Sequence, residues 1–111
     1  MALSLLFFYP LPGLSQSVTV TQDKFIIGQS GKSAELKCEH ERTNYYSMYW
    51  YQQKVQQGLK LMVHSTNAGD NGKMEDGFSS WTLSRTHIVN STLILPSVSP
   101  EDSAAYFCAI S

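Results

Sequence analysis

Two cysteines, Cys38 and Cys108, restrict the folds open to this chain more than any other feature. Each lies in a short run with the pattern of a β-strand, in which alternate side chains point to the same face. In "AELKC" the alternation groups Leu36 with Cys38, and in "AAYFCAI" it groups Tyr106 with Cys108. We therefore expect both cysteines to point into a core, where cysteines on different strands can meet across two packed sheets.

The first residues, "MALSLLFFYPLPGLSQ", differ in composition from the rest of the chain. Leu3 to Tyr9 are almost all apolar, and the prolines and glycine at positions 10, 12 and 13 then interrupt any helix. This pattern is typical of a secretory signal peptide cleaved after Ser15, although no Lys or Arg precedes the apolar run. It predicts a signal peptide at residues 1–15 and a folded domain at residues 16–111. An N-terminal core strand or a truncated leader is the alternative.

A secretory route favours one disulfide between Cys38 and Cys108, because extracellular compartments are oxidising. Two free buried thiols are the alternative. A metal pair is not indicated, because no His or Cys lies at ligand spacing near either cysteine. If bonded, the two cysteines close a loop of about 70 residues, which the chain-entropy model values at roughly 4 kcal/mol.

The chain between and around the cysteines has no helical periodicity and no internal repeat. Short alternating runs separated by turn residues predict an all-β antiparallel sandwich. The predicted strands lie in "SVTVT", the start of "FIIGQSGKS", "AELKC", "YSMYWYQQK", "GLKLMVH", "FSSWTLS", "STLILP" and "AAYFCAI". The dipeptide Asn71-Gly72 is a hairpin signal. The predicted core contains Leu36, Trp50, Leu93, Leu95 and Tyr106, with the Trp50 indole packed on the cysteine pair.

The faces of the strands opposite the core are unusually apolar. Alternation places Leu59, Leu61 and Val63 in phase on one strand, and the outward positions of three strands include Tyr49, Tyr51, Leu59, Leu61 and Phe107. Neighbouring strands would join these side chains into one patch, and monomeric proteins rarely expose such patches. The pattern indicates an interface with another protein, the alternative being scattered surface aromatics.

The framework of Cys38, Trp50 and Cys108, with Tyr106 two residues before the second cysteine, resembles an immunoglobulin variable domain. The runs "MYWYQQ", "GLKLM" and "SPEDSAAYFCAIS" are similar to T-cell receptor beta-chain variable segments. The resemblance implies a V-type Greek-key sandwich with a Cys38–Cys108 inter-sheet disulfide. It also implies that the Tyr106 hydroxyl bonds back to upstream backbone. An aspartate such as Asp102 is often paired with a base in the family, but no basic residue stands at the matching position here.

The end of the chain carries a further expectation. Only three residues follow Cys108, so the final (G) strand of the sandwich would be missing and the third recognition loop would barely begin at Ala109. We expect the strand that carries Phe107 to lack its outer neighbour. An unpaired edge of this kind promotes aggregation.

The resemblance also implies partners. The face that docks an alpha variable domain maps onto Tyr51, Gln53, Leu59, Leu61 and Phe107. Two loops would contact a peptide–major-histocompatibility complex, and their Tyr, Ser and Asn content suits a recognition surface. They contain Arg42, Thr43, Asn44, Tyr45, Tyr46, Ser47, Ser65, Thr66, Asn67, Ala68, Gly69 and Asp70. Such a domain belongs to a cell-surface receptor whose constant region, absent here, contacts signalling subunits. Asn90 begins an "NST" sequon and is a candidate glycosylation site.

Several function classes are disfavoured. The net charge of −1 argues against a nucleic-acid-binding protein. His40, His64 and His87 lack metal-ligand spacing, and no catalytic motif occurs, so we expect neither an enzyme nor a cofactor. No run after the leader is long enough to span a membrane. The remaining alternatives are a V-type domain of another receptor or adhesion protein, another antigen-receptor locus (gamma or light chain), or a germline remnant with no product.

Overall fold

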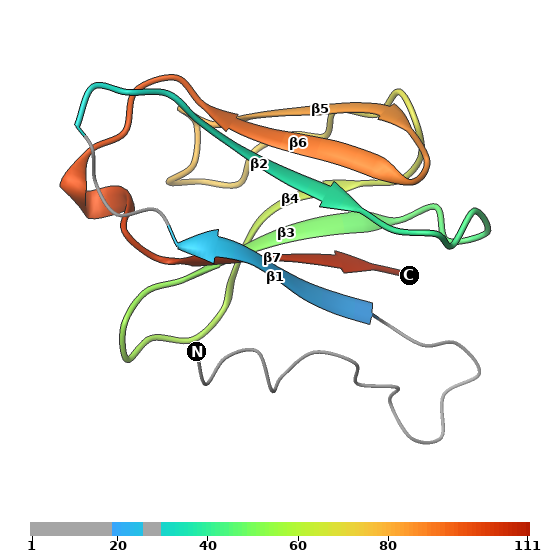
Figure 1. Ribbon diagram of the computed structural model, residues 1–111, viewed down its shortest axis with the longest axis horizontal. Coiled ribbons are helices and arrows are strands. Elements are labelled where there is room, and N and C mark those ends of the chain that lie inside the picture. The colour runs from blue at the N-terminus through green and yellow to red at the C-terminus, as the bar shows by residue number, and fades with distance from the viewer. Residues whose placement is uncertain (1–18, 26–29) are drawn as a thin grey trace.

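The computed structural model describes residues 19–25 and 30–111, and for residues 19–25 only the backbone. The predicted signal peptide at residues 1–15 lies outside the described residues. The described chain forms seven strands and a short 3₁₀-helix, η2 (Figure 1). They are β1 (Thr19–Phe25), β2 (Ala34–Glu39), β3 (Met48–Gln53), β4 (Lys60–Ser65), β5 (Thr82–His87), β6 (Asn90–Leu95), η2 (Pro100–Asp102) and β7 (Ala105–Ile110).

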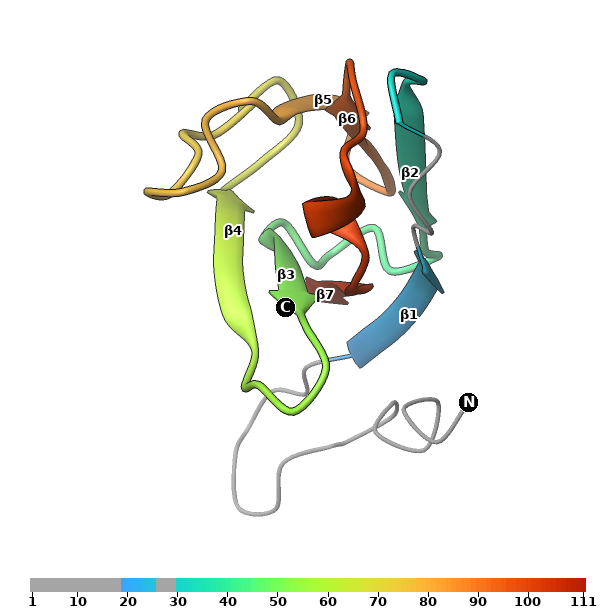
Figure 2. The same ribbon diagram turned by 90° about the vertical axis from the view of Figure 1, so that its left-hand side faces the viewer.

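The strands form two layers, which confirms the predicted all-β sandwich. One sheet has the order β1-β7-β3-β4 and the other the order β2-β6-β5, with every pair antiparallel. Figure 2 shows β1 and β4 at opposite edges of the first sheet, with β2, β6 and β5 forming the second layer. Among the described residues, no helix has the length and apolar character needed to cross a membrane.

Alternation along the strands builds the core between the layers. In β2 the buried positions are Leu36 and Cys38, and in β6 they are Ser91, Leu93 and Leu95. The register sets Leu36 against Leu93 and Cys38 against Ser91, so the inward side chains of neighbouring strands lie side by side. Because inward residues of each sheet face the other sheet, these positions supply one continuous core.

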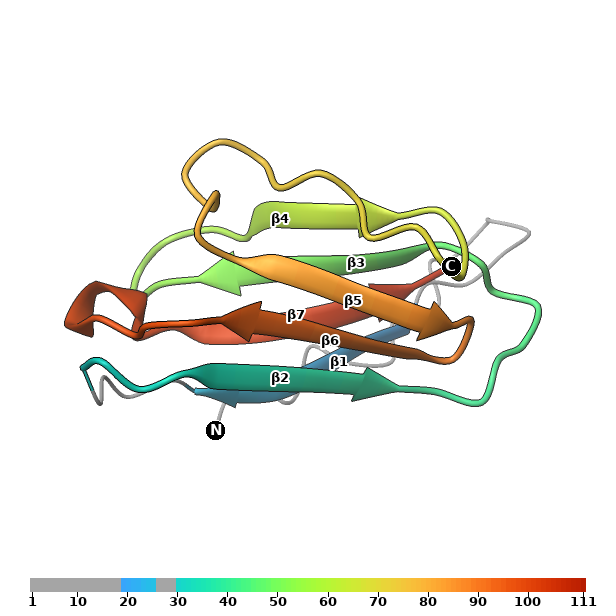
Figure 3. The ribbon, with the colours of Figure 1, turned by 90° about the horizontal axis from the view of Figure 1, so that it is seen from above.

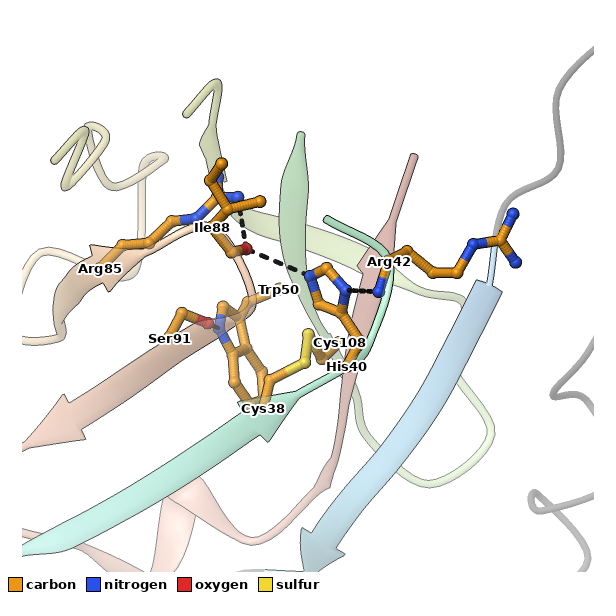
Figure 4. Close-up of a disulfide and its surroundings, with 8 residues drawn as sticks. All are labelled: Cys38, His40, Arg42, Trp50, Arg85, Ile88, Ser91 and Cys108. Atoms are coloured by element: carbon orange, nitrogen blue, oxygen red, sulfur yellow. Dashed lines mark hydrogen bonds between the residues drawn. A yellow bond between two sulfur atoms is a disulfide. The ribbon is translucent and has the colours of Figure 1, made fainter. Parts of the chain in front are cut away.

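The disulfide joins the two sheets through this core. Cys38 in β2 and Cys108 in β7 are bonded, with Cα atoms 6.2 Å apart and a sequence separation of 70. Trp50 is fully buried beside them, and its Nε1–H donates to the Ser91 hydroxyl at 3.0 Å (Figure 4). The indole therefore packs on the disulfide while its one polar atom has a partner in the opposite sheet.

Tyr106 holds the 3₁₀-helix η2 against the start of β7. Its hydroxyl donates to the Asp102 carbonyl at 2.6 Å and accepts from Gln52 Nε2 at 3.0 Å, as the expected tyrosine corner does. The ring packs against Trp81 with centroids 5.2 Å apart. Burial raises the pKa of Tyr106 to about 12. The Asp102 carboxylate accepts from the Ser99 N–H at 2.8 Å.

A bulge in β4 overturns the predicted phase of that strand. Trp50 pairs with Val63 but Tyr51 pairs with Leu61, so Met62 is the extra residue. Met62 and Val63 are both fully buried. Val63 therefore faces the core while Leu61 faces outward, and the prediction that the two share a face is wrong.

The outer edge of β7 also differs from the prediction. β1 lies along this edge, with Thr21 opposite Cys108 and Thr19 opposite Ile110, while β3 lies along the other edge. The expectation that this strand lacks an outer neighbour is therefore wrong. Every residue of β7 is buried, and both edges of the strand are paired.

Two further segments depart from the sequence pattern. Strand β5 begins at Thr82, and the preceding residues form turns in which the Trp81 N–H donates to the Phe78 carbonyl at 3.0 Å. Asn71-Gly72 does not form a hairpin, because β4 and β5 belong to different sheets. Gly72 has a φ of +67°, and a Cβ there would lie 2.6 Å from Val63 Cγ2, so only glycine fits.

Candidate recognition surface

One end of the sandwich gathers the segments predicted to bind antigen. Figure 3 shows the β2–β3 connection, the β5–β6 turn and the C-terminus at the same end of the molecule. The first loop (residues 40–47) and the end of β7 are joined directly. The Ser47 N–H donates to the Ser111 carbonyl at 3.1 Å, and the Ser111 N–H donates to the Ser47 carbonyl at 3.0 Å. The first loop therefore has a fixed position relative to β7.

Arg42 and Tyr45 form a unit at the exposed part of this loop. The Arg42 guanidinium lies 4.3 Å from the Tyr45 ring centroid, and its Nη2 donates to the Tyr45 hydroxyl at 2.9 Å. The Tyr45 N–H donates to the Arg42 carbonyl at 3.1 Å. The stacked pair presents a cation and an aromatic ring that are already ordered. Binding to another molecule would therefore cost these two side chains little further conformational entropy.

A surface hollow of about 600 Å³ lies beside this pair. Its lining comes from the first loop, the adjacent strand β3 and the chain end, namely Arg42, Asn44, Tyr45, Tyr46, Ser47, Tyr49 and Ser111. Thr43 is exposed but does not line it. Tyrosines with serine and asparagine offer rigid aromatic area and adaptable hydrogen bonds, which suits recognition of a protein or peptide surface.

The second loop (residues 65–70) is organised by Asp70. Its carboxylate accepts from the Thr66 N–H at 2.9 Å, from the Thr66 hydroxyl at 2.8 Å and from the Gly72 N–H at 2.8 Å. These hydrogen bonds, led by the Thr66 N–H, lower the pKa of Asp70 to about 2. The order they give is present above the ordinary carboxyl pKa of 3.8 and is lost as the pH falls toward 2.

The structure separates the predicted residues of this loop into two groups. Ser65 is fully buried at the end of β4, and its hydroxyl donates to the Asp70 carbonyl at 2.6 Å, so Ser65 is not available for contact. The exposed residues are Thr66, Asn67, Ala68 and Gly69. Ser65 and Asp70 therefore shape the loop, and the other four present its surface.

The outward face of the four-stranded sheet carries the predicted docking residues. Tyr51 lies opposite Leu61 on one side and Phe107 on the other, so the three form a row across β4, β3 and β7. Leu59 is 51% exposed, and Tyr51 and Leu61 are half-buried. Phe107 is only 1% exposed, so it does not offer a free surface for docking.

The same face also carries the polar side chains of Gln53 and His64. Gln53 Nε2 donates to the Gln57 carbonyl at 2.9 Å, while the buried Oε1 of Gln53 has no partner. Tyr49 stacks on His64 with centroids 4.5 Å apart. Burial, followed by the neighbouring Tyr49, raises the pKa of Tyr51. The Gln53 Oε1 is therefore a buried acceptor whose hydrogen-bonding capacity the described residues leave unused.

Asn90, the sequon asparagine, lies at the start of β6 at the recognition end. It is half-buried and lines a hollow of about 390 Å³ with Glu39, His40, Glu41 and Val89. Its Oδ1 is buried without a partner. The next residue, Ser91, points inward to Trp50, and Thr92 is half-buried on the other face.

Sequence reasoning missed Arg85 and the polar side chains around it. Arg85 is 1% exposed and contacts the second loop through Ser65, and its N–H donates to Asn71 Oδ1 at 3.2 Å. The signal was present in "TLSRTH", where alternation puts Arg85 on the buried face with Leu83. Across the described residues, no group of three or more His, Cys, Asp or Glu could hold a metal ion.

Comparison with known proteins identifies the family. The immunoglobulin V-set domain family matches residues 21–111. Human T cell receptor beta variable 6-6 is 38% identical over 95 residues, which cover 83% of this chain and 80% of the relative. The chain belongs to the T cell receptor beta variable segments of the immunoglobulin V-set family.

Two further matches bear on this assignment. A solved structure from work on the structural basis of T cell specificity and activation by the bacterial superantigen toxic shock syndrome toxin-1 matches with a TM-score of 0.73. It is 33% identical, and the match covers 86% of this beta variable domain and 82% of that chain. Human T cell receptor alpha variable 9-1 is 31% identical over 104 residues, covering 94% of this chain and 90% of the relative. The higher identity to the beta segment favours the beta locus.

Proposed function

We propose that this beta variable domain recognises antigen as half of a receptor heterodimer. It pairs with an alpha variable domain, and its loops contact a peptide presented by a major-histocompatibility molecule. The observation that carries the proposal is the arrangement of two pre-ordered polar loops at one end of the sandwich, beside the start of the third. In a complete receptor chain the domain would lie on the outer face of the plasma membrane, and a constant region would contact the signalling subunits.

The docking face supports the pairing. Leu59, Leu61 and Tyr51 give an apolar strip on the sheet that ends at the recognition loops. Gln53 lies beside the strip, and after a rotation that exposes its amide it can exchange hydrogen bonds with an amide of the partner. A partner on this face would bring its own loops next to the first loop and the end of β7. The domain performs binding by surface complementarity and no catalysis.

Changing Leu59 to arginine tests the docking face. In a complete beta chain co-expressed with an alpha chain, Leu59→Arg is expected to lower the surface heterodimer by about tenfold or more, because an unpaired cation would be buried at the interface. Flow cytometry measures the heterodimer. Ile94→Arg is the matched control, since Ile94 is a half-buried apolar residue on the outward face of the other sheet. Equal heterodimer levels for wild type and Leu59→Arg, with both variants folded, would contradict the proposed docking face.

The alternative of a V-type receptor from another locus has one specific support, the 31% identity to an alpha variable segment over most of the chain. A transcript read through Ser111 separates the two. Beta joining and constant sequence downstream supports the proposal, and any other continuation favours the alternative.

We also propose that Asn90 is glycosylated when the chain passes through the secretory pathway. When the chain is expressed in mammalian cells, we expect it to migrate on a gel at a higher apparent mass than the bare polypeptide. Treatment with peptide N-glycosidase F is expected to remove this difference. Thr92→Ala destroys the sequon without touching Ser91, whose hydroxyl serves Trp50, and is expected to abolish the shift. Intact-mass measurement of both proteins checks occupancy. A wild-type mass equal to that of the bare polypeptide would refute this modification.

A further inference from the structure

Arg85 is a buried cation whose side chain and backbone both form hydrogen bonds to neighbouring segments. Its Nη1 donates to the Ser65 carbonyl at 3.1 Å and to the Ser65 hydroxyl at 3.0 Å, and its Nη2 donates to the Ile88 carbonyl at 2.9 Å. The backbone of Arg85 adds two bonds, since its N–H donates to Asn71 Oδ1 and its carbonyl accepts from the Gly69 N–H at 2.8 Å. One residue of β5 thus holds both ends of the second loop.

The first loop is held at the same point from the other side. The Arg42 N–H donates to His40 Nδ1 at 3.0 Å, so Nδ1 is an acceptor and the ring proton is on Nε2. Nε2–H then donates to the Ile88 carbonyl at 3.2 Å. The His40 N–H also donates to the Val89 carbonyl at 3.0 Å, which ties the base of the first loop to the β5–β6 turn.

A single carbonyl therefore receives both loops. Figure 4 shows the Arg85 guanidinium and the His40 ring converging on the oxygen of Ile88, with the Arg42 N–H on the far side of the imidazole. A carbonyl oxygen has two lone pairs, so both bonds form at once. Any displacement of this turn must change both bonds, and through them both loops.

We infer that the Ile88 carbonyl, bound by Arg85 and His40, couples the conformations of the first and second recognition loops, with Arg85 as the positioning residue. The inference rests on the proposed function only in calling these segments recognition loops. A contact on one loop would alter the order of the other loop through the β5–β6 turn.

The chemistry of the site indicates that Arg85 positions the neighbouring segments rather than only filling space in the core. Burial lowers the pKa of Arg85, and the Asp70 carboxylate opposes that effect without an ion pair. The buried Nε of Arg85 has no partner. A well-packed apolar side chain avoids these desolvation costs, so an arginine here is explained by its fork, which reaches Ser65 and Ile88 together. The single ammonium group of a lysine could not reach both residues in this way.

Amide hydrogen exchange on the whole chain tests the coupling. In Arg85→Met, the amides of Gly69 and Arg42 are both expected to exchange at least about fivefold faster than the change in global stability explains, which is the low end of measured couplings. The Leu93 amide in the core reports that global change. Thr86→Met is the matched control, because Thr86 is the exposed neighbour on β5. Faster exchange at Gly69 with Arg42 unchanged would overturn the coupling.

Two more variants keep the test decisive if Arg85→Met does not fold. Arg85→Lys retains the charge but not the fork, and is expected to speed exchange at both amides. His40→Phe removes the other donor, and coupling is reciprocal, so the Gly69 amide is expected to exchange faster although His40 does not contact the second loop. An unchanged Gly69 amide in His40→Phe contradicts the inference.

The titration of His40 gives a second readout. Burial lowers the pKa of His40, and the charges of Arg85 and Arg42 lower it further, while its bond to Ile88 acts the opposite way. Glu39 and Glu41 line the same hollow. Arg85→Met is expected to raise the His40 pKa toward its ordinary value, whereas Arg85→Lys is expected to leave it nearly unchanged. These measurements need no antigen or alpha chain, so their failure is distinct from failure of Leu59→Arg to reduce the heterodimer.

Discussion

A chain in which Cys38 and Cys108 are both alanine is expected to lose about 4 kcal/mol of unfolding free energy. The disulfide joins β2 of one sheet to β7 of the other across a separation of 70 residues, so it restricts the unfolded chain strongly. Domains of this size are stable by about 5–15 kcal/mol, and the loss is therefore a large share of the total. Urea unfolding followed by tryptophan fluorescence measures it.

The reduced wild-type chain is the matched control for this experiment. It lacks the cross-link but keeps both sulfur atoms, so its difference from the double alanine variant isolates the packing lost from the core. Reduction alone is expected to account for most of the loss. A double alanine variant within about 1 kcal/mol of the oxidised wild type would show that the cross-link contributes far less than the chain-entropy model assigns.

The residues that define the sandwich were predictable because their signals are local. Alternation with a period of two placed Leu36, Trp50 and Tyr106 on inward faces, and the structure buries all three. The same rule placed Tyr51 and Leu59 outward, where they are half-buried and 51% exposed. A period of two requires only the residues of one strand, so no knowledge of the fold is needed.

The features that were missed depend on partners distant in sequence. The bulge at Met62 exists only in the register between β3 and β4, and nothing in "KLMVHS" marks it. The placement of β1 beside β7 follows from how strands far apart in sequence pair. Asn71 is not part of a hairpin, and its side chain accepts a hydrogen bond from the Arg85 N–H. Arg85 belongs to β5 in the opposite sheet, so the local sequence could not show this contact.

Replacing Trp50 by alanine is expected to lower the unfolding free energy by about 3–5 kcal/mol. The indole is fully buried between the sheets and contacts the disulfide region, so its removal leaves a cavity at the centre of the core. The change also leaves the buried Ser91 hydroxyl without its donor, which adds the cost of an unsatisfied polar group. Urea unfolding monitored by circular dichroism measures the loss, because Trp81 is the only tryptophan that the variant retains.

Trp50→Phe keeps the test decisive if the alanine variant does not fold. Phenylalanine fills part of the cavity but cannot donate to Ser91 Oγ, so a loss smaller than that of alanine but well above zero is expected. Ser91→Ala is expected to be less destabilising in the Trp50→Phe background than in wild type, because the hydroxyl then has no bond to lose. Additive effects of the two changes would show that the 3.0 Å contact contributes nothing measurable.

The two large effects are expected to overlap. Trp50 pairs with Cys108 in the register of β3 and β7, and Ser91 pairs with Cys38 in the register of β2 and β6. The indole and the disulfide thus connect the same two points of opposite sheets, one by packing and a hydrogen bond and the other by a covalent link. Once the cysteines are alanine, the region can relax around a smaller side chain, so Trp50→Phe should cost less there than in the oxidised wild type. Equal costs in both backgrounds would mean that the two links act independently.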